Sequence, residues 1–179
     1  MRKALFLSII CLLVWIGSFS QDLILGKFLG GITNMRLIGT SRYKLYEKQV
    51  EMVELNTSGQ SRSTTLSFKF NPCAASADFM AHAQTGTLMS KGDITILEKP
   101  NATVGINLIK YKVYFEDAVV VSCNDTQACN NTMATTVVLK PQRICWVYYN
   151  YDGNGKATTT SNGYDLKSGQ SWVVAIPNF

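Results

Sequence analysis

The sequence predicts a mainly β fold, a compact antiparallel β-barrel or sandwich with one short α-helix. Polar and apolar residues alternate along residues 64–70, as they do in a strand with one buried face. Residues 104–123 form a long stretch rich in β-branched and aromatic side chains, which favour strands. Only residues 76–86 carry both the start and the stop signals of a helix. Many strands with one helix favour a sheet that closes or folds onto itself.

The other strands are predicted from shorter apolar or alternating runs. The apolar positions of residues 104–123 shift phase, from Val104, Ile106 and Leu108 to Ile109 and Tyr111, which predicts a β-bulge or burial on both faces. The segments rich in Asn, Thr, Ser and Gly, residues 56–63, 123–132 and 152–163, are predicted to be loops. The expected strands are residues 22–28, 35–39, 43–55, 64–70, 94–97, 104–123, 135–139, 144–151 and 171–176.

The predicted helix begins at the capping residue Ser76 and ends at Gly86, with an acidic residue in its first turn. Phe79, Met80 and Ala83 share one helical face. A helix of about ten residues is marginal by itself, so it requires packing on the sheet. We therefore expect it to cover an opening or an edge of the β structure.

The first twenty residues are expected to be a secretory signal peptide. A basic head, Met1-Arg2-Lys3, precedes an apolar run over residues 4–17, and small residues precede a cleavage site after Ser20. The alternative is a membrane anchor, but a spanning helix needs about 20 apolar residues. We expect residues 21–179 to be a single domain, secreted or periplasmic, with no membrane span after cleavage.

Four cysteines lie outside the expected signal peptide, and an even number in an exported chain favours disulfide bonds. Four cysteines allow three pairings. A local Cys123–Cys129 bond across a polar, turn-like segment is the favoured one, which leaves Cys73–Cys145 as the second bond. The spacings lack the paired cysteines of a zinc site, and one histidine adds little. No metal or other cofactor is expected.

The basic residues do not predict a nucleic-acid partner. The formal charge of +5 falls to +3 once Arg2 and Lys3 leave with the signal peptide. The remaining lysines are dispersed, whereas a nucleic-acid footprint is dense and interleaved with aromatic residues. Only Lys110 and Lys112 are paired at strand spacing, which puts them on one face, and we expect solvated charges there.

The residues of known catalytic sites are sparse. His82 is the only histidine, and there is no G-x-S-x-G turn for a nucleophilic serine. A pair of carboxylates brought together from distant strands stays open as a glycosidase hypothesis. Residues 152–156 resemble the opening of a calcium loop, but Asp-Gly and Asn-Gly are also typical of a tight turn, which we favour. The sequence therefore predicts a protein that is not an enzyme.

Aromatic residues near the end of the chain form a candidate binding surface. Exposed side chains of this kind predict an alternative role, in which an exported β-domain binds a protein or a glycan at the cell surface. The candidates are Tyr148, Tyr149, Tyr151, Tyr164 and Trp172.

Three stretches resemble the haemolysin-coregulated protein (Hcp) family, the tube protein of type VI secretion. Leu66-Ser-Phe-Lys-Phe70 followed by residues 76–86 is similar to the family's strand and single helix, which commonly ends in Thr-Gly. Residues 109–122 resemble its Y-K-L strand pair. Trp146-Val-Tyr-Tyr149 with Gly163-Tyr-Asp-Leu-Lys167 is similar to its closing W-x-Y and G-W-D-L-K motifs, with Tyr164 where Trp is usual. The order and spacing of the matches carry the resemblance.

The resemblance implies a barrel-like fold whose copies form hexameric rings that stack into a hollow tube. Such a protein is structural, has itself as its main partner, and handles secreted cargo proteins. The expected signal peptide and disulfides depart from the family, because its usual tube is built in the cytoplasm. The sequence therefore predicts an exported relative of the tube subunit.

Overall fold

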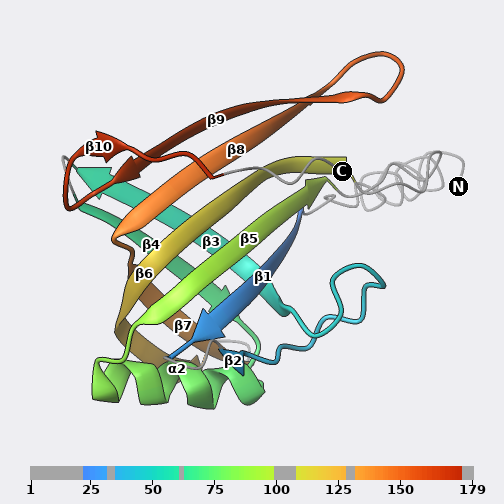
Figure 1. The fold of residues 1–179 in the computed structure, drawn as a ribbon. Helices are drawn as coiled ribbons and strands as arrows, with labels where there is room; N and C mark the ends of the chain where they lie inside the picture. The colour runs from blue at the N-terminus through green and yellow to red at the C-terminus, as the bar shows by residue number, and fades with distance from the viewer. Residues whose placement is uncertain (1–21, 32–34, 61–62, 99–107, 128–131, 175–179) are drawn as a thin grey trace, which may run out of the picture.

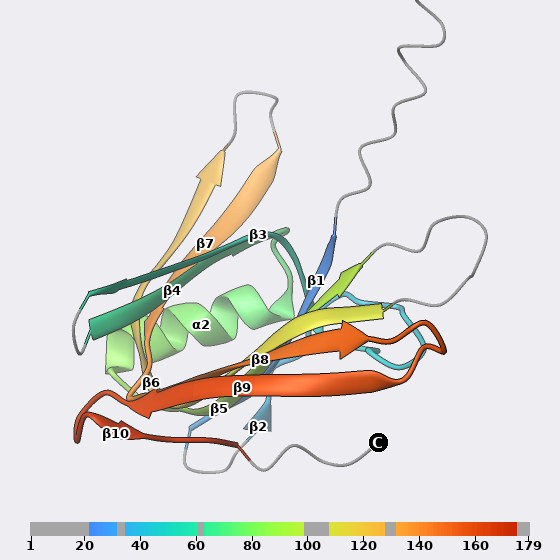
Figure 2. The same cartoon turned by 90° about the horizontal axis from the view of Figure 1, so that it is seen from above.

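The structure, a computed structural model, describes residues 22–31, 35–60, 63–98, 108–127 and 132–174. The described strands form one antiparallel sheet in the order β10-β9-β8-β6-β5-β1-β3-β4-β7, with β2 paired to β1 (Figures 1 and 2). This arrangement, with a single helix in the described part of the chain, confirms the predicted fold class. The strands are β1 (Leu23–Gly30), β2 (Met35–Arg36), β3 (Val50–Gln60), β4 (Ser63–Phe70), β5 (Met89–Glu98), β6 (Leu108–Gln127), β7 (Met133–Lys140), β8 (Arg143–Tyr151), β9 (Ala157–Asp165) and β10 (Gln170–Ser171).

The long strand β6 closes the barrel. Its first half pairs with β5 on one side and β8 on the other, and its second half pairs with β7. Asp117, which has a positive φ of 52°, lies between the two halves. Because β7 also pairs with β4, the path β6-β5-β1-β3-β4-β7 returns to β6. Strands β8, β9 and β10 continue the sheet outside this closed ring, as Figure 2 shows.

Three segments predicted as loops are partly strands, and these predictions are wrong. β3 continues to Gln60 and β6 to Gln127, and β9 occupies Ala157–Asp165. These strand ends are rich in Thr, Asn and Ser, and most of their described residues are exposed. A strand that is exposed to solvent on both faces shows no alternation of polar and apolar residues, so the periodicity that identifies strands is missing there.

The predicted bulge in the long strand is confirmed. The β5–β6 register shifts where Ile96 faces Tyr111 and Leu97 faces Ile109, so Lys110 is the extra residue. After the bulge, Tyr111, Val113 and Phe115 face the core together. A second shift, between Val120 and Ser122, occurs where the strand pairs with β7.

Helix α2 (Ala74–Thr85) lies across one end of the barrel (Figure 1). It begins three residues earlier than predicted, because the N-cap is Cys73 and not Ser76; the Ser76 hydroxyl accepts the Cys73 N–H at 3.1 Å. The expected acidic residue is not in the first turn. The stop signal is confirmed, because Gly86 has a φ of 67° and its N–H donates to the His82 carbonyl.

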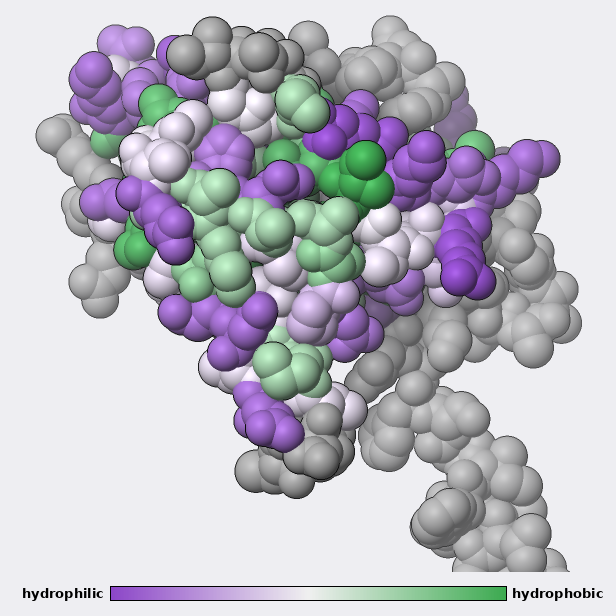
Figure 3. All heavy atoms as spheres, turned by 90° about the horizontal axis from the view of Figure 1, so that it is seen from below, coloured by the Kyte–Doolittle hydropathy of each residue, from purple (hydrophilic) through white to green (hydrophobic). Residues whose placement is uncertain are grey.

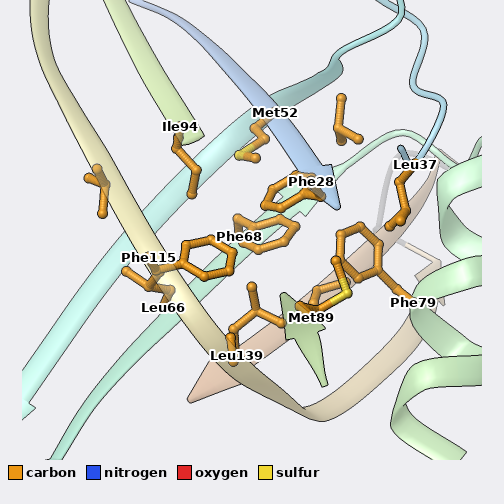
Figure 4. Packing of buried hydrophobic residues seen from close by; sticks show 14 of the residues in the cluster. Phe28, Leu37, Met52, Leu66, Phe68, Phe79, Met89, Ile94, Phe115 and Leu139 are labelled. Carbon is orange, nitrogen blue, oxygen red and sulfur yellow. The ribbon is translucent and has the colours of Figure 1, made fainter. Parts of the chain in front are cut away.

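The core is a cluster of phenylalanines between the barrel wall and the helix (Figure 4). Phe79 of α2 is fully buried and contacts Phe28, Phe68 and Phe70, with ring centroids 5.2–5.9 Å away. Phe28 and Phe68 stack at 5.3 Å across the barrel. The helix therefore closes the barrel by inserting one aromatic side chain, which explains how so short a helix is stable.

Candidate functional site

The strands β1, β5, β6 and β8 also bury the face that points away from the barrel core, here called the outer face. Along β8, Ile144 and Trp146 pack on the core, whereas Cys145 and Val147 are buried on the opposite side. Leu25 of β1 is likewise fully buried outside the core cluster. A sheet face carrying buried residues must be covered by other parts of the chain, so this face is more than a solvated surface.

A partly buried ion pair lies in the outer face. The Lys112 ammonium lies 3.7 Å from Asp93 Oδ2, and the lysine side chain is only 9% exposed. The Thr95 hydroxyl donates to Asp93 Oδ1 at 3.3 Å, and Lys112 Nζ lies 5.8 Å from the centre of the Tyr114 ring. Burial raises the pKa of Asp93 above its usual value, although Lys112 lowers it in part. The prediction of a solvated Lys112 is wrong, because its side chain is buried in the outer face and paired with Asp93.

Tyrosines surround this ion pair. Burial is the main cause that raises the pKa values of Tyr46, Tyr114 and Tyr149, and the negative charge of Asp93 raises each of them further. Tyr149 also interacts with Tyr114, and the Tyr151 hydroxyl accepts the Ile109 N–H at 3.1 Å. Tyr46 comes from the segment between β2 and β3. That segment therefore covers part of the outer face.

A charged network joins β9 to the rest of the sheet. Arg143 donates from Nη1 to Glu116 Oε2 at 2.8 Å and from Nε to Asp165 Oδ2 at 3.3 Å. Glu116 also pairs with Lys91 at 3.3 Å. Asp165 Oδ1 accepts the backbone N–H groups of the turn into β10, at Lys167 and Ser168. Asp165 thus connects the end of β9 both to β8 and to the turn that sends the chain back over the sheet.

Residues 172–174 return over the outer face and form one wall of a pocket of about 220 Å³. The Trp172 N–H donates to the Gly163 carbonyl at 2.9 Å. A Cβ at Gly163 would collide with the Trp172 carbonyl oxygen and with Cys145, so glycine permits this close approach. The other lining side chains come from β1, β5 and β6 and include Lys27, Leu29, Lys91, Asp93 and Tyr114.

The structure divides the five predicted aromatic candidates between two faces. Tyr148 lies on the side of Trp146 and has its ring 5.5 Å from that of Tyr111. Tyr164 pairs with Ile144 and shares its side of the sheet. Both are about half exposed. Tyr149 and Tyr151 belong instead to the outer face, because successive residues of a strand point to opposite sides. Trp172, which follows β10, lines the pocket on the same face. Binding by either group stays a prediction.

The three described cysteines are free thiols, so the Cys73–Cys145 bond, expected as the second of the two bonds, is absent from the structure. Cys73 caps α2 and packs against the core, whereas Cys145 is buried on the outer face. Burial raises the pKa of Cys123 to about 11, and its thiol lies 3.9 Å from the Ser76 carbonyl oxygen. Cys129 and the signal peptide, residues 1–20, lie outside the described residues. A Cys123–Cys129 bond and export therefore stay predictions.

His82 and the loop that begins at Asp152 have structural hydrogen-bond partners. His82 Nδ1 lies 3.0 Å from the Thr87 carbonyl oxygen at the end of α2. Asp152 Oδ1 accepts the N–H groups of Asn154 and Lys156, which is the hydrogen bonding of a tight turn. In the described part of the chain, no three His, Cys, Asp or Glu side chains gather closely enough to hold a metal ion. No described helix has the length and apolar character of a membrane span.

The end of the barrel that carries α2 presents an apolar surface, here called the helix-end patch. Its members are Met35, Ile38 and Leu88, exposed by 71%, 52% and 45%, with the outward residues Ala77 and Ala81 of α2. Hydrogen bonds keep these elements together: Ala75 N–H donates to the Ile38 carbonyl, and Gly31 N–H to the Leu88 carbonyl. Figure 3 shows the apolar side chains that gather on this face. Large exposed apolar side chains in one area are typical of an interaction surface.

The barrel with one helix across its end is the fold of the Hcp proteins of type VI secretion systems. The structure of Hcp1 from Salmonella typhimurium superposes with a TM-score of 0.70 at 18% identity, covering 84% of this chain and 99% of that one. A second solved type six secretion system protein gives 0.70 at 15% identity, over 85% and 100% of the two chains. The secreted protein Hcp3 from Pseudomonas aeruginosa gives 0.59 at 17% identity, over 78% and 97%.

No protein-family model matches the sequence, and no curated protein matches it either. The resemblance inferred from the residue motifs is thus confirmed at the level of the fold. At this identity the structural likeness establishes the fold alone.

Proposed function

We propose that this chain is a non-enzymatic structural protein, exported from the cytoplasm, whose copies assemble into rings like those of a type VI secretion tube subunit. The hexameric ring is the expected assembly, and secreted cargo proteins are the expected passengers. The observation that carries the proposal is the match to Hcp structures along almost their whole length, 97–100% of the three neighbours described above. The match thus includes nearly all of the barrel and helix of each neighbour.

The surface of the chain supports assembly with copies of itself. The helix-end patch combines exposed Met35 and Ile38 with a helix whose outward side chains are mostly small and uncharged. Charged residues are depleted from the cores of protein interfaces, and apolar side chains are enriched there. We infer that the patch is buried against a neighbouring copy, where it is protected from water.

Light scattering of the purified protein over a range of concentrations tests the assembly. The expected molar mass is a multiple of the protomer mass, and electron microscopy of the same sample is expected to show rings. A strictly monomeric protein at high concentration, with no rings, would contradict the proposed function.

Paired variants test the role of the patch. Ile38→Glu places a charge in the patch and is expected to shift the assembly toward monomer, because a buried unpaired charge is costly. Val121→Glu is the matched control: Val121 is similarly exposed, at 56%, but lies on β6. If Ile38→Glu still assembles and Val121→Glu does not, the interface lies at the β6–β7 hairpin and not at the patch. The proposed ring assembly would then still hold.

A second candidate function is the binding of a protein or a glycan at a cell surface. The observation that favours it is the exposure of Tyr148 and Tyr164 on the same side of the β8–β9 pair, which extends beyond the barrel. Labelled protein is expected to bind cells, and Tyr148→Ala with Tyr164→Ala is expected to abolish that binding. Unchanged binding by the double variant would contradict this candidate.

A further inference from the structure

The pocket on the outer face has the size of a small ligand site. Its volume of about 220 Å³ exceeds that of engineered apolar cavities of roughly 150 Å³ that bind benzene. One six-membered ring with a small polar substituent therefore fits. Leu29, Val174 and the rings of Tyr114 and Trp172 supply the apolar lining. Pockets of this composition hold the apolar body of a ligand and orient it through a few polar groups.

The charges around the pocket favour an anion. The two carboxylates that line the pocket are already engaged, Asp93 by Lys112 and Glu116 by Lys91 and Arg143, and Arg143 also pairs with Asp165. Lys27, Lys91, Asp93 and Glu116 line the pocket. The ion pairs of these two carboxylates add Lys112, Arg143 and, through Arg143, Asp165, so the connected network holds four cations and three carboxylates. The remaining positive charge belongs to the rim, where Lys27 and the 64% exposed Lys91 border the apolar lining.

We propose that this pocket binds a small amphipathic anion, an aromatic or apolar ring that carries a carboxylate. The ring packs between Trp172 and the floor formed by Leu29 and Tyr114, and the carboxylate meets the ammonium groups of Lys27 and Lys91. Hydrogen bonds between charged groups are stronger than neutral ones, and they orient the ligand in the pocket. This inference goes beyond the proposed ring assembly and does not depend on it.

Saturation-transfer NMR with three probes of similar size but different charge tests the proposal, since this method works for a monomer and for a large ring alike. The probes are phenylacetate, neutral phenylacetamide and cationic phenethylamine. Phenylacetate is expected to bind with a dissociation constant of about 1 mM, and the amide about tenfold more weakly. Equal binding of all three probes, tighter binding of phenethylamine, or no saturable binding would overturn the proposal.

Variants locate the binding to the pocket. Lys27→Met combined with Lys91→Met is expected to weaken phenylacetate binding about tenfold, because the methionines keep the length of the side chains and remove the charge. Trp172→Ala is expected to weaken binding through loss of the ring contact. Lys140→Met is the control, because Lys140 is an exposed lysine on β7, outside the pocket lining. Equal affinity of the wild type and the double lysine variant would overturn the proposal.

The alternative to a free ligand in this pocket is the end of the chain, residues 175–179. Residues 175–179 follow directly after Val174, which lines the pocket. Phenylacetate that binds only after removal of residues 175–179 would assign the pocket to that segment and overturn the proposal. Ring assembly has its own readout in light scattering, so a failure of either proposal is recognised separately.

Discussion

The two faces of the β1–β5–β6–β8 wall are both buried but are built differently. The inner face is a set of apolar side chains closed by Phe79 of α2. The outer face holds an Asp93–Lys112 ion pair with tyrosines around it, and two separate segments cover it, one that brings Tyr46 and one that brings Trp172. The inner face is formed by large apolar side chains at alternate positions within each strand. The outer face exists only once distant segments fold over the sheet.

This difference indicates that the inner face mainly stabilises the fold, whereas the outer face offers a ligand-binding site. Apolar packing is non-directional and scales with the area buried. Removing charges from water costs free energy that their pairing offsets only in part. The outer face therefore contributes less to stability than the inner face, but it offers charged and polar groups that a ligand can contact. We therefore expect substitutions in the inner face to change mainly unfolding, and substitutions in the outer face to change mainly ligand contact and the placement of the covering segments.

The largest effect is expected for Phe79→Ala. The substitution removes the contacts of this ring with Phe28, Phe68 and Phe70 and leaves a cavity at the helix–barrel junction. The free energy of unfolding should fall by about 3–5 kcal/mol, as measured by urea denaturation. Met80→Ala, on the same helix but only partly buried, should cost clearly less. Equal effects of the two variants would show that Phe79 does not anchor the helix.

A smaller effect is expected for Gly163→Ala, which tests the cover of the outer face. The new methyl group would collide with the Trp172 carbonyl and with Cys145, so residues 172–174 must move. We expect a loss of about 1–3 kcal/mol and faster reaction of the Cys145 thiol with a disulfide reagent. Gly153→Ala is the matched control, since nothing lies within 4 Å of the added carbon there. Unchanged reactivity of Cys145 would mean that the segment does not shield it.

Asp93→Asn should change how stability depends on pH. The pKa of Asp93 is raised in the folded protein, so the folded state binds more protons than the unfolded state between the unfolded and folded pKa values. The contribution of Asp93 to stability is therefore greatest below its unfolded pKa and is lost as the pH rises through the folded pKa. Across this range, the urea midpoint of the wild type should rise relative to that of Asp93→Asn as the pH falls. A constant difference would contradict the shift.

The smallest effect is expected for Glu54→Gln, which breaks an exposed ion pair. Lys69 Nζ lies 2.7 Å from Glu54 Oε2, and both side chains are 43% exposed. The hydrogen bond from Lys69 lowers the pKa of Glu54, so its contribution is present above the unfolded pKa and fades in acid, opposite to that of Asp93. Exposed pairs contribute at most about 0.2–1 kcal/mol, and salt should reduce the difference. A larger loss that salt does not reduce would contradict this comparison.

Much of the barrel is predictable from the sequence, because its inner face repeats every second residue. The alternation in residues 64–70 and the phase shift near Lys110 identified β4 and the bulge in β6. The terminal Gly86 identified the end of α2. β9 was not predicted because its Thr, Ser and Asn residues are exposed to solvent on both faces of the strand at most positions. Local pattern therefore predicts strands only where at least one face is buried.

The outer face was not predictable in the same way. Lys112 in a Lys-x-Lys pattern is typical of a solvated strand, and no local signal indicates that it is buried. Its burial depends on segments tens of residues away in the sequence, around Tyr46 and Trp172. Likewise, Tyr148 and Tyr149 are neighbours in the chain, but the pleat of β8 sends them to opposite faces. Proximity in sequence is thus a poor guide to a shared surface on a strand.

Electron microscopy of the purified protein at high concentration tests the proposed assembly most directly. The proposal predicts closed rings with rotational symmetry, with six subunits in the expected form, whose mass in solution is a multiple of the protomer mass. A uniform population of particles of protomer mass at every concentration would contradict it.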